Sequence, residues 1–159
     1  MKVLHIITSL GSGGAEGMLY RLILTSKNSV EHSVICLNHG GKFVSLLREN
    51  NIDVLVLDFK SKSSIKAFFK LLRFSQLKKK QGYKLITSWL YHSDIVAWFI
   101  KIFLNFNGLV WNIRYTNLQL GRPSVKRWLT LKLLSILSYL KVNSIISCSK
   151  SASEIHKKN

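Results

Sequence analysis

The chain alternates short apolar runs with longer segments in which apolar residues recur at helical spacing. The short runs predict strands at residues 3–8, 32–37, 52–57, 85–88, 109–113 and 144–148. The longer segments predict helices at 15–26, 43–50, from Ser63-Ser64 onward, 94–104 and 124–140. The pattern is therefore one of strands and helices in regular alternation.

Two predicted helices carry apolar residues at the spacing of one helical face. In the first helix these are Met18, Leu19, Leu22 and Ile23. In the helix after Ser63-Ser64 they are Ile65, Phe68, Phe69 and Leu72. Because the strands are short, apolar on both faces and separated by helices, the expected α/β fold is a Rossmann-like doubly wound, mainly parallel sheet of about six strands with helices on both faces.

Length and charge narrow the class of protein. The 159 residues suffice for a single domain spanning 1–159, and 24 Lys+Arg against 7 Asp+Glu give a net charge of +17. Such a charge favours nucleic acid, an anionic membrane surface or a phosphorylated small molecule as partner. A groove-reading motif or stacking platform is missing from the sequence, so no specific nucleic acid is expected.

The spacing of cysteines and histidines bears on metal binding. Cys36 and Cys148 each lie in an apolar run, which predicts two buried thiols. The five histidines are scattered, so the sequence predicts no metal or other cofactor.

The apolar run at the N-terminus is too short for a signal peptide, and lysine and asparagine interrupt the longest apolar stretches. We therefore expect a cytoplasmic protein, with peripheral membrane attachment left open.

In open parallel sheets ligands bind beyond the carboxyl ends of the strands, so candidate site residues are those that follow each strand. Gly13 and Gly14 follow the first strand and could bring backbone N–H groups close to a phosphate, or could form only a flexible turn. Glu16 is a further candidate for binding the donor diphosphate or the acceptor, or could simply complement the helix dipole. His92 could contact a substrate or cap a helix, and Arg114 could clamp a phosphate or be a solvated charge.

Basic residues concentrate between Lys60 and Lys84, where nine occur without an acidic residue. The predicted helix in this span also carries phenylalanines, which is typical of a helix that docks on anionic lipid headgroups. A solvated basic face over core aromatics is the alternative. The candidate membrane or anion contacts are Lys66, Lys70, Arg73, Lys78, Lys79 and Lys80.

Four segments in order resemble the N-terminal domain of family 4 glycosyltransferases, which have the GT-B fold. They are Gly13-Gly14-Ala15-Glu16, the run from Thr87 to Asp94, the run from Val110 to Arg114, and Ser147-Cys148-Ser149 with Glu154 and His156. The resemblance implies a retaining enzyme that transfers a sugar from a nucleotide sugar to an acceptor between two Rossmann-like halves. It implies Gly13, Gly14 and His92 near the donor diphosphate and sugar, with His92 as the candidate catalytic residue.

The same resemblance implies that a C-terminal nucleotide-sugar domain is absent from these residues, so the chain alone is expected to be inactive. That second half could be a separate polypeptide. A basic, apolar face suits a lipid-linked or surface-polysaccharide acceptor at the bacterial inner membrane. The alternative is a non-catalytic basic module that associates with membranes.

Overall fold

The chain forms a parallel α/β sheet. The computed structural model describes residues 1–38, 40–59, 64–113, 125–139 and 142–147, so Arg114 and Cys148 lie outside the described residues. The strands of the described part are β1 (Lys2–Ile7), β2 (Glu31–Cys36), β3 (Asp53–Val56), β4 (Leu85–Trp89), β5 (Gly108–Ile113) and β6 (Ser144–Ser147). They form one sheet in the order β3-β2-β1-β4-β5-β6, and every neighbouring pair is parallel. The predicted fold class is confirmed.

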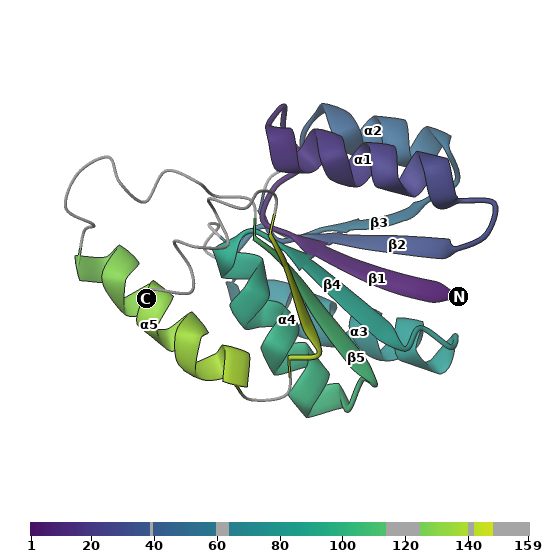
Figure 1. Cartoon of the computed structure of the whole chain (residues 1–159). Helices are drawn as coiled ribbons and strands as arrows, with labels where there is room; N and C mark the ends of the chain where they lie inside the picture. The colour runs from purple at the N-terminus through teal and green to yellow at the C-terminus, as the bar shows by residue number, and fades with distance from the viewer. Residues whose placement is uncertain (39, 60–63, 114–124, 140–141, 148–159) are drawn as a thin grey trace.

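Helices cover both faces of this sheet (Figure 1). Helices α1 (Gly14–Ser26) and α2 (Lys42–Glu49) lie on one face over β1, β2 and β3. Helices α3 (Ser64–Lys80) and α4 (Tyr91–Leu104) lie on the opposite face, and α5 (Val125–Tyr139) packs beside α4. The change of face follows from right-handed crossovers, because the chain moves outward from β1 in one direction to reach β2 and in the other to reach β4.

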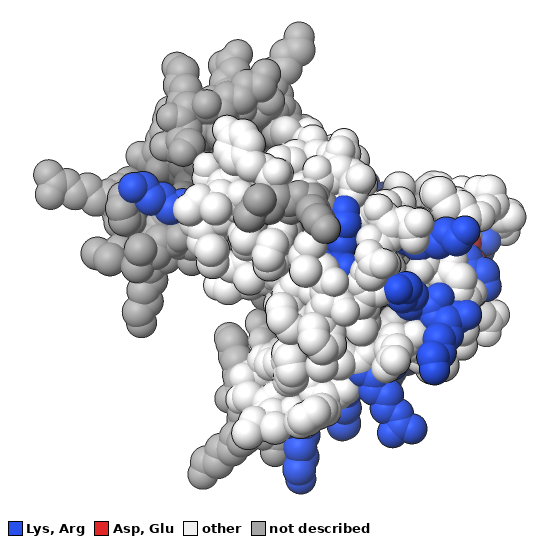
Figure 2. Space-filling view, turned by 90° about the horizontal axis from the view of Figure 1, so that it is seen from below, with Lys and Arg blue, Asp and Glu red and all other residues white. Residues whose placement is uncertain are grey.

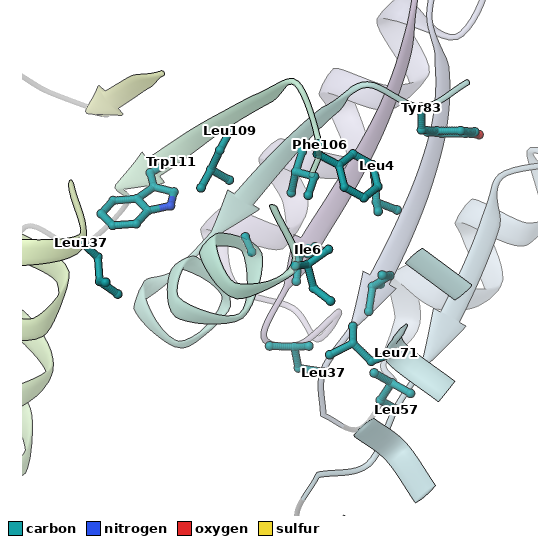
Figure 3. Close-up of a cluster of buried hydrophobic side chains, with 14 of the residues drawn as sticks. Leu4, Ile6, Leu37, Leu57, Leu71, Tyr83, Phe106, Leu109, Trp111 and Leu137 are labelled. Atoms are coloured by element: carbon teal, nitrogen blue, oxygen red, sulfur yellow. The ribbon is translucent and has the colours of Figure 1, made fainter. Parts of the chain in front are cut away.

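Each face of the sheet has its own hydrophobic core. On the α3–α4 face, Leu4 and Ile6 of β1 join Leu71 of α3 and Ile100 of α4 in one cluster, part of which Figure 3 shows. On the α1–α2 face, Ile7 of β1 packs with residues such as Leu19 and Leu47. Successive strand residues point to opposite faces, so the near-continuous apolar sequence of β1 is what two covered faces require.

Helix α3 buries only part of the face that its sequence predicts, since Phe68 and Leu72 are half-buried and Leu72 packs against the core. Ile65 and Phe69 are 74% and 64% exposed. The buried residues are Ala67, Leu71, Ser75 and Lys78. The Lys78 ammonium is neutralised by Asp53 of β3 across a 2.6 Å ion pair. Ala67 and Leu71 belong to the core cluster and mark the side of α3 that faces it.

The first helix and the cysteine are closer to expectation. Leu19 and Ile23 of α1 are fully buried, whereas Met18 and Leu22 at the edge of the predicted face are 40% and 43% exposed. Cys36 is buried as predicted, and burial raises the pKa of its thiol to about 11. A thiol with so high a pKa stays protonated and packs as an apolar side chain.

Candidate functional site

The candidate site lies where the direction of winding reverses. Strand β1 pairs with β2 on one side and β4 on the other, all parallel. The chain leaves β1 toward α1 on one face and leaves β4 toward α4 on the other. The loops after β1 and β4 therefore diverge at the carboxyl edge, and such switch points are where open α/β sheets bind ligands.

The loop after β1 is held by close backbone packing. A Cβ atom on Gly41, in the loop after β2, would lie 2.5 Å from the Leu10 carbonyl oxygen and 2.7 Å from Gly11 Cα. The Phe43 amide also donates a 3.3 Å hydrogen bond to the Leu10 carbonyl. Gly11 and Gly14 have open space where a side chain would lie. The loop after β1 therefore packs against the loop after β2, whereas the space beside Gly11 and Gly14 is open.

Glu16 closes back over this loop. Gly13 precedes α1 as its N-terminal cap residue and makes no side-chain cap, and Glu16 lies in the first turn. The Glu16 side chain is 8% exposed, and its Oε1 accepts a 2.9 Å hydrogen bond from Ser9 Oγ. Its Oε2 lies 2.4 Å from the position of a Cβ on Gly13. The carboxylate thus fills the space that the missing side chain leaves, at the helix end whose dipole favours an anion.

His92 stands on the other side of the switch point. Helix α4 begins at Tyr91, three residues earlier than Asp94, the predicted start, and this places His92 in its first turn. The His92 side chain is exposed. Leu90, which precedes the helix, has φ 79° and ψ 145°, a conformation that costs a non-glycine residue about 1–3 kcal/mol. The surroundings must hold this turn in place.

A buried polar cluster lies beneath that turn. Ser88 Oγ donates a 2.6 Å hydrogen bond to Asp94 Oδ1, and Asn112 Nδ2 donates a 3.1 Å bond to the Ser88 carbonyl. Ser93 Oγ donates to the Trp89 carbonyl and, at 2.6 Å, to the Leu90 carbonyl. Burial raises the pKa of Asp94 to about 7. Sequence reasoning missed this cluster, although polar Ser88 and Asn112 near the ends of adjacent apolar strands were a signal.

A second set of linked polar side chains runs from β4 across β1 and β2 to the end of α1. His5 Nε2 and His32 Nδ1 are 2.9 Å apart, and the rings stack. Hydrogen bonds extend this set from His5 Nδ1 to Thr87 Oγ1 at 2.5 Å and from His32 Nε2 to Ser26 Oγ at 2.9 Å. Burial, with a smaller contribution from His32, lowers the pKa of His5 to about 3. His5 is therefore a neutral structural link, which sequence reasoning also missed.

The basic residues of α3 divide by exposure. Lys66, Lys70, Arg73 and Lys80 are exposed. Lys79 is half-buried, and its Nζ donates to the Leu104 carbonyl. Lys78 is only 5% exposed and pairs with Asp53, so its assignment as a membrane contact is corrected. Its ammonium is already neutralised within the fold.

Exposed aromatic rings accompany these cations. Phe69 of α3 and Phe103 of α4 are 64% and 62% exposed. Ring contacts continue between them, with centroids 6.2 Å apart for Phe69–Phe68, 5.9 Å for Phe68–Phe99 and 5.5 Å for Phe99–Phe103. We name these four residues the phenylalanine strip. On the face shown in Figure 2, most of the Lys and Arg lie along the right and lower sides of a broad uncharged area, and little acidic surface is visible.

Other features of the described part lie away from the switch point. A cavity of about 490 Å³ opens at the amino edge of the sheet, between the starts of β1, β4 and β5. Its lining residues are Met1, Lys2, Gly82, Lys84, Leu85, Asn107 and Gly108. Within the described ranges, three or more His, Cys, Asp or Glu side chains never gather as metal ligands do, and every helix is too short or too polar to cross a membrane.

Comparison with solved structures gives the fold a wider context. Anabaena HepE in complex with UDP superposes with a TM-score of 0.76 at 18% identity, over 99% of this chain and 40% of HepE. A complex of HepE with UDP and glucose gives 0.76 at 19% identity, over 99% and 41%. The chain therefore spans about two fifths of HepE, in which UDP is bound.

Two further solved structures share the fold. The lipopolysaccharide outer core galactosyltransferase WaaB has a TM-score of 0.51 at 21% identity, over 70% of this chain and 32% of WaaB. A putative UDP-N-acetylglucosamine 2-epimerase from Listeria monocytogenes has 0.58 at 14% identity, over 99% and 41%. No protein-family model matches the sequence, and no curated protein matches it. The chain thus has the fold of the N-terminal half of GT-B proteins.

Proposed function

We propose that the chain is the N-terminal half of a glycosyltransferase that uses a nucleotide sugar. The observation that carries the proposal is the switch point, where the open glycine loop after β1 and the strained turn that presents His92 flank the same edge of the sheet. Proteins with this fold and bound UDP or a named galactosyltransferase activity support it. The family 4 resemblance adds a retaining reaction.

In this proposal the chain supplies one wall of a cleft, and a second Rossmann-like domain supplies most of the nucleotide site. Catalysis then depends on orienting donor and acceptor and on neutralising charge on the departing diphosphate. His92 is exposed on the first turn of α4, so its imidazole can reach a substrate in the cleft. The hydrogen bond from Ser93 Oγ to the Leu90 carbonyl holds that turn and so positions His92.

The test is release of nucleoside diphosphate by the protein together with its second domain, supplied with a panel of nucleotide sugars and a membrane lipid extract. We expect release that requires the extract and a loss of about a hundredfold or more in His92→Ala, since a positioned polar group typically contributes that much. An epimerase with the same fold would convert the nucleotide sugar into its epimer without needing an acceptor from the extract. Conversion without transfer, or full activity in His92→Ala, contradicts the proposal.

A second function is favoured by the phenylalanine strip, which we propose inserts into an anionic membrane surface and brings the enzyme to a lipid-linked acceptor at the inner membrane. Exposed rings beside Lys66, Lys70 and Arg73 combine apolar insertion with attraction to anionic headgroups. The proposal locates the protein in the cytoplasm, bound peripherally to the inner membrane.

Vesicle flotation tests it. Neutralising Lys66, Lys70 and Arg73 with Gln should weaken binding to anionic vesicles about a hundredfold, since each cation near the surface contributes about 1 kcal/mol. The matched control replaces Arg21, Lys27 and Lys42, which are exposed on α1, directly after α1 and on α2, across the sheet. Equal losses in both triple variants would show that only net charge matters, and equal binding to neutral vesicles would contradict the role of the cations.

A further inference from the structure

The exposed face of α3 is apolar and basic along the length of the helix. Ile65, Phe69 and Leu77 are 74%, 64% and 49% exposed. Ile65 and Leu77 lie near opposite ends of α3, about 18 Å apart along its axis. The exposed cations beside these residues are Lys66, Lys70, Arg73 and Lys80. A membrane surface contacts the whole face at once only when α3 lies flat on it.

Helix α4 adds a second exposed stripe on the same side of the sheet (Figure 1). At 3.6 residues per turn, His92, Phe99 and Phe103 lie within roughly 40° of one another around α4. All three side chains are exposed. The Phe99 ring contacts Phe103 at 5.5 Å and Phe68 of α3 at 5.9 Å, measured between centroids. The phenylalanine strip therefore continues from α3 onto the stripe of α4 that carries His92.

Charge separates this side of the sheet from the other. Helices α3 and α5 contain no acidic residue, and the only one in α4, Asp94, is 1% exposed. On the opposite side, α2 ends with the exposed carboxylate of Glu49. The side formed by α3 and α4 is thus the one that complements anionic headgroups.

We propose that α3 and α4 lie flat on an anionic membrane and hold His92 at the level of the lipid headgroups. The acceptor is then a lipid whose reacting hydroxyl belongs to its headgroup. The inference rests on both proposed functions and adds to them the orientation of the enzyme and the class of its acceptor.

The orientation selects the acceptor by height. With α4 flat, His92 lies about 10 Å from Phe99 along the membrane surface rather than above it. The far end of an extended lipid-linked glycan would project past this level. In the transfer, the headgroup oxygen forms the new glycosidic bond and the bond between sugar and diphosphate breaks. The nucleoside diphosphate leaves with that electron pair and takes up the hydroxyl proton.

Paramagnetic relaxation tests the orientation without turnover. The ¹⁵N-labelled 159-residue chain is bound to bicelles of phosphatidylcholine and phosphatidylglycerol that carry a nitroxide on the headgroup. We expect the Phe69, His92 and Phe103 amides to relax alike, within about twofold, and the Arg21 and Lys42 amides across the sheet to be unaffected. An upright α4 would lift His92 about 16 Å above Phe103. Relaxation at His92 tenfold or more below that at Phe103 would overturn the proposal.

Serine substitutions at the two ends of α3 test whether the whole helix makes contact. Ile65→Ser and Leu77→Ser should each weaken bicelle binding at least threefold, because each removes an apolar side chain from the membrane surface. Leu22→Ser is the matched control, since Leu22 is 43% exposed on α1 across the sheet, and it should bind as the wild type does. Unchanged affinity in either α3 variant, or an equal loss in Leu22→Ser, would overturn the flat orientation.

Turnover by the protein together with its second domain tests the acceptor class. The membrane lipid extract is separated into lipids with at most one sugar and lipid-linked oligosaccharides, and each fraction is supplied with radioactive nucleotide sugars. We expect transfer to the first fraction at least tenfold faster than to the second. An equal or faster transfer to the oligosaccharides would overturn the acceptor class and leave the proposed transferase standing. No release of nucleoside diphosphate with either fraction would contradict the proposed transferase itself, and the acceptor class with it.

Discussion

Ser88 Oγ donates a 2.6 Å hydrogen bond to Asp94 Oδ1, and this contact ties the end of β4 to the first turn of α4. Between the two residues the chain passes through Leu90, whose φ is 79°. The buried Ser88–Asp94 bond therefore spans the strained turn that presents His92.

The strain at Leu90 is measurable by comparing two variants. Leu90→Gly and Leu90→Ala both remove the half-buried side chain, but only glycine adopts φ 79° without strain. We expect Leu90→Gly to be more stable than Leu90→Ala by about 1 kcal/mol in urea unfolding, the reverse of the usual order. The matched pair is Ile65→Gly and Ile65→Ala in α3, where alanine should be the more stable. Alanine being more stable at both positions would argue against the strain.

Asp94 should make stability depend on pH in an unusual direction. Burial raises its pKa from 3.8 to about 7, so between these values the folded chain binds more protons than the unfolded one. This contribution to the free energy of unfolding falls as pH rises, by no more than roughly 4 kcal/mol over the window. Asp94→Asn keeps an oxygen for Ser88 and does not titrate. In urea unfolding at pH 5 and pH 8, the wild type should lose more stability than Asp94→Asn, and parallel losses would refute the assignment.

His5 should act in the opposite direction at acidic pH. Its pKa is lowered from 6.5 to about 3, so between these values the unfolded chain binds the additional proton. Stability from His5 is complete above pH 6.5 and is lost as pH falls toward 3. Thermal unfolding at pH 7 and pH 4.5 should show a steeper acid loss in the wild type than in His5→Asn. His92→Asn, at an exposed site, is the control and should retain the steep loss.

Gly41, in the loop after β2, and Gly14, at the start of α1, should differ in how much stability is lost when a methyl group is added. Gly41→Ala places a Cβ 2.5 Å from the Leu10 carbonyl oxygen, against backbone that cannot give way, and should cost about 2 kcal/mol or more. Gly14→Ala meets nothing within 4 Å and should change stability by less than about 1 kcal/mol. Chemical denaturation of both variants checks this, and a Gly41→Ala chain as stable as the wild type would mean that the two loops are not packed together.

The strands and helices were predictable because β-branched runs and helical spacing report local burial on a covered sheet. The start of α4 was placed at Asp94 because the Leu90 turn has no sequence signal, leucine being a rare residue at positive φ. The predicted face of α3 was only partly right, with Leu72 packed against the core but Ile65 and Phe69 exposed, because the side that faces the core depends on contacts with other elements. The same reason hid the His5–His32 and Ser88–Asp94 contacts, which depend on strand register and on where α4 begins. The placement of His92, Gly13 and Gly14 at the same edge of the sheet was predictable because residues that follow parallel strands meet there, and their role in binding stays a prediction.

The proposed function requires that substrates bind at the carboxyl edge of the sheet, between the glycine loop and His92. Its most direct test is the amide and His92 side-chain chemical shifts of the labelled chain on titration with UDP at millimolar concentration. We predict saturable shifts at His92 and at the Leu90–Asp94 amides, weakened in His92→Ala. Shifts confined to the cavity at the opposite edge, around Lys2, Lys84 and Gly108, would contradict the claim.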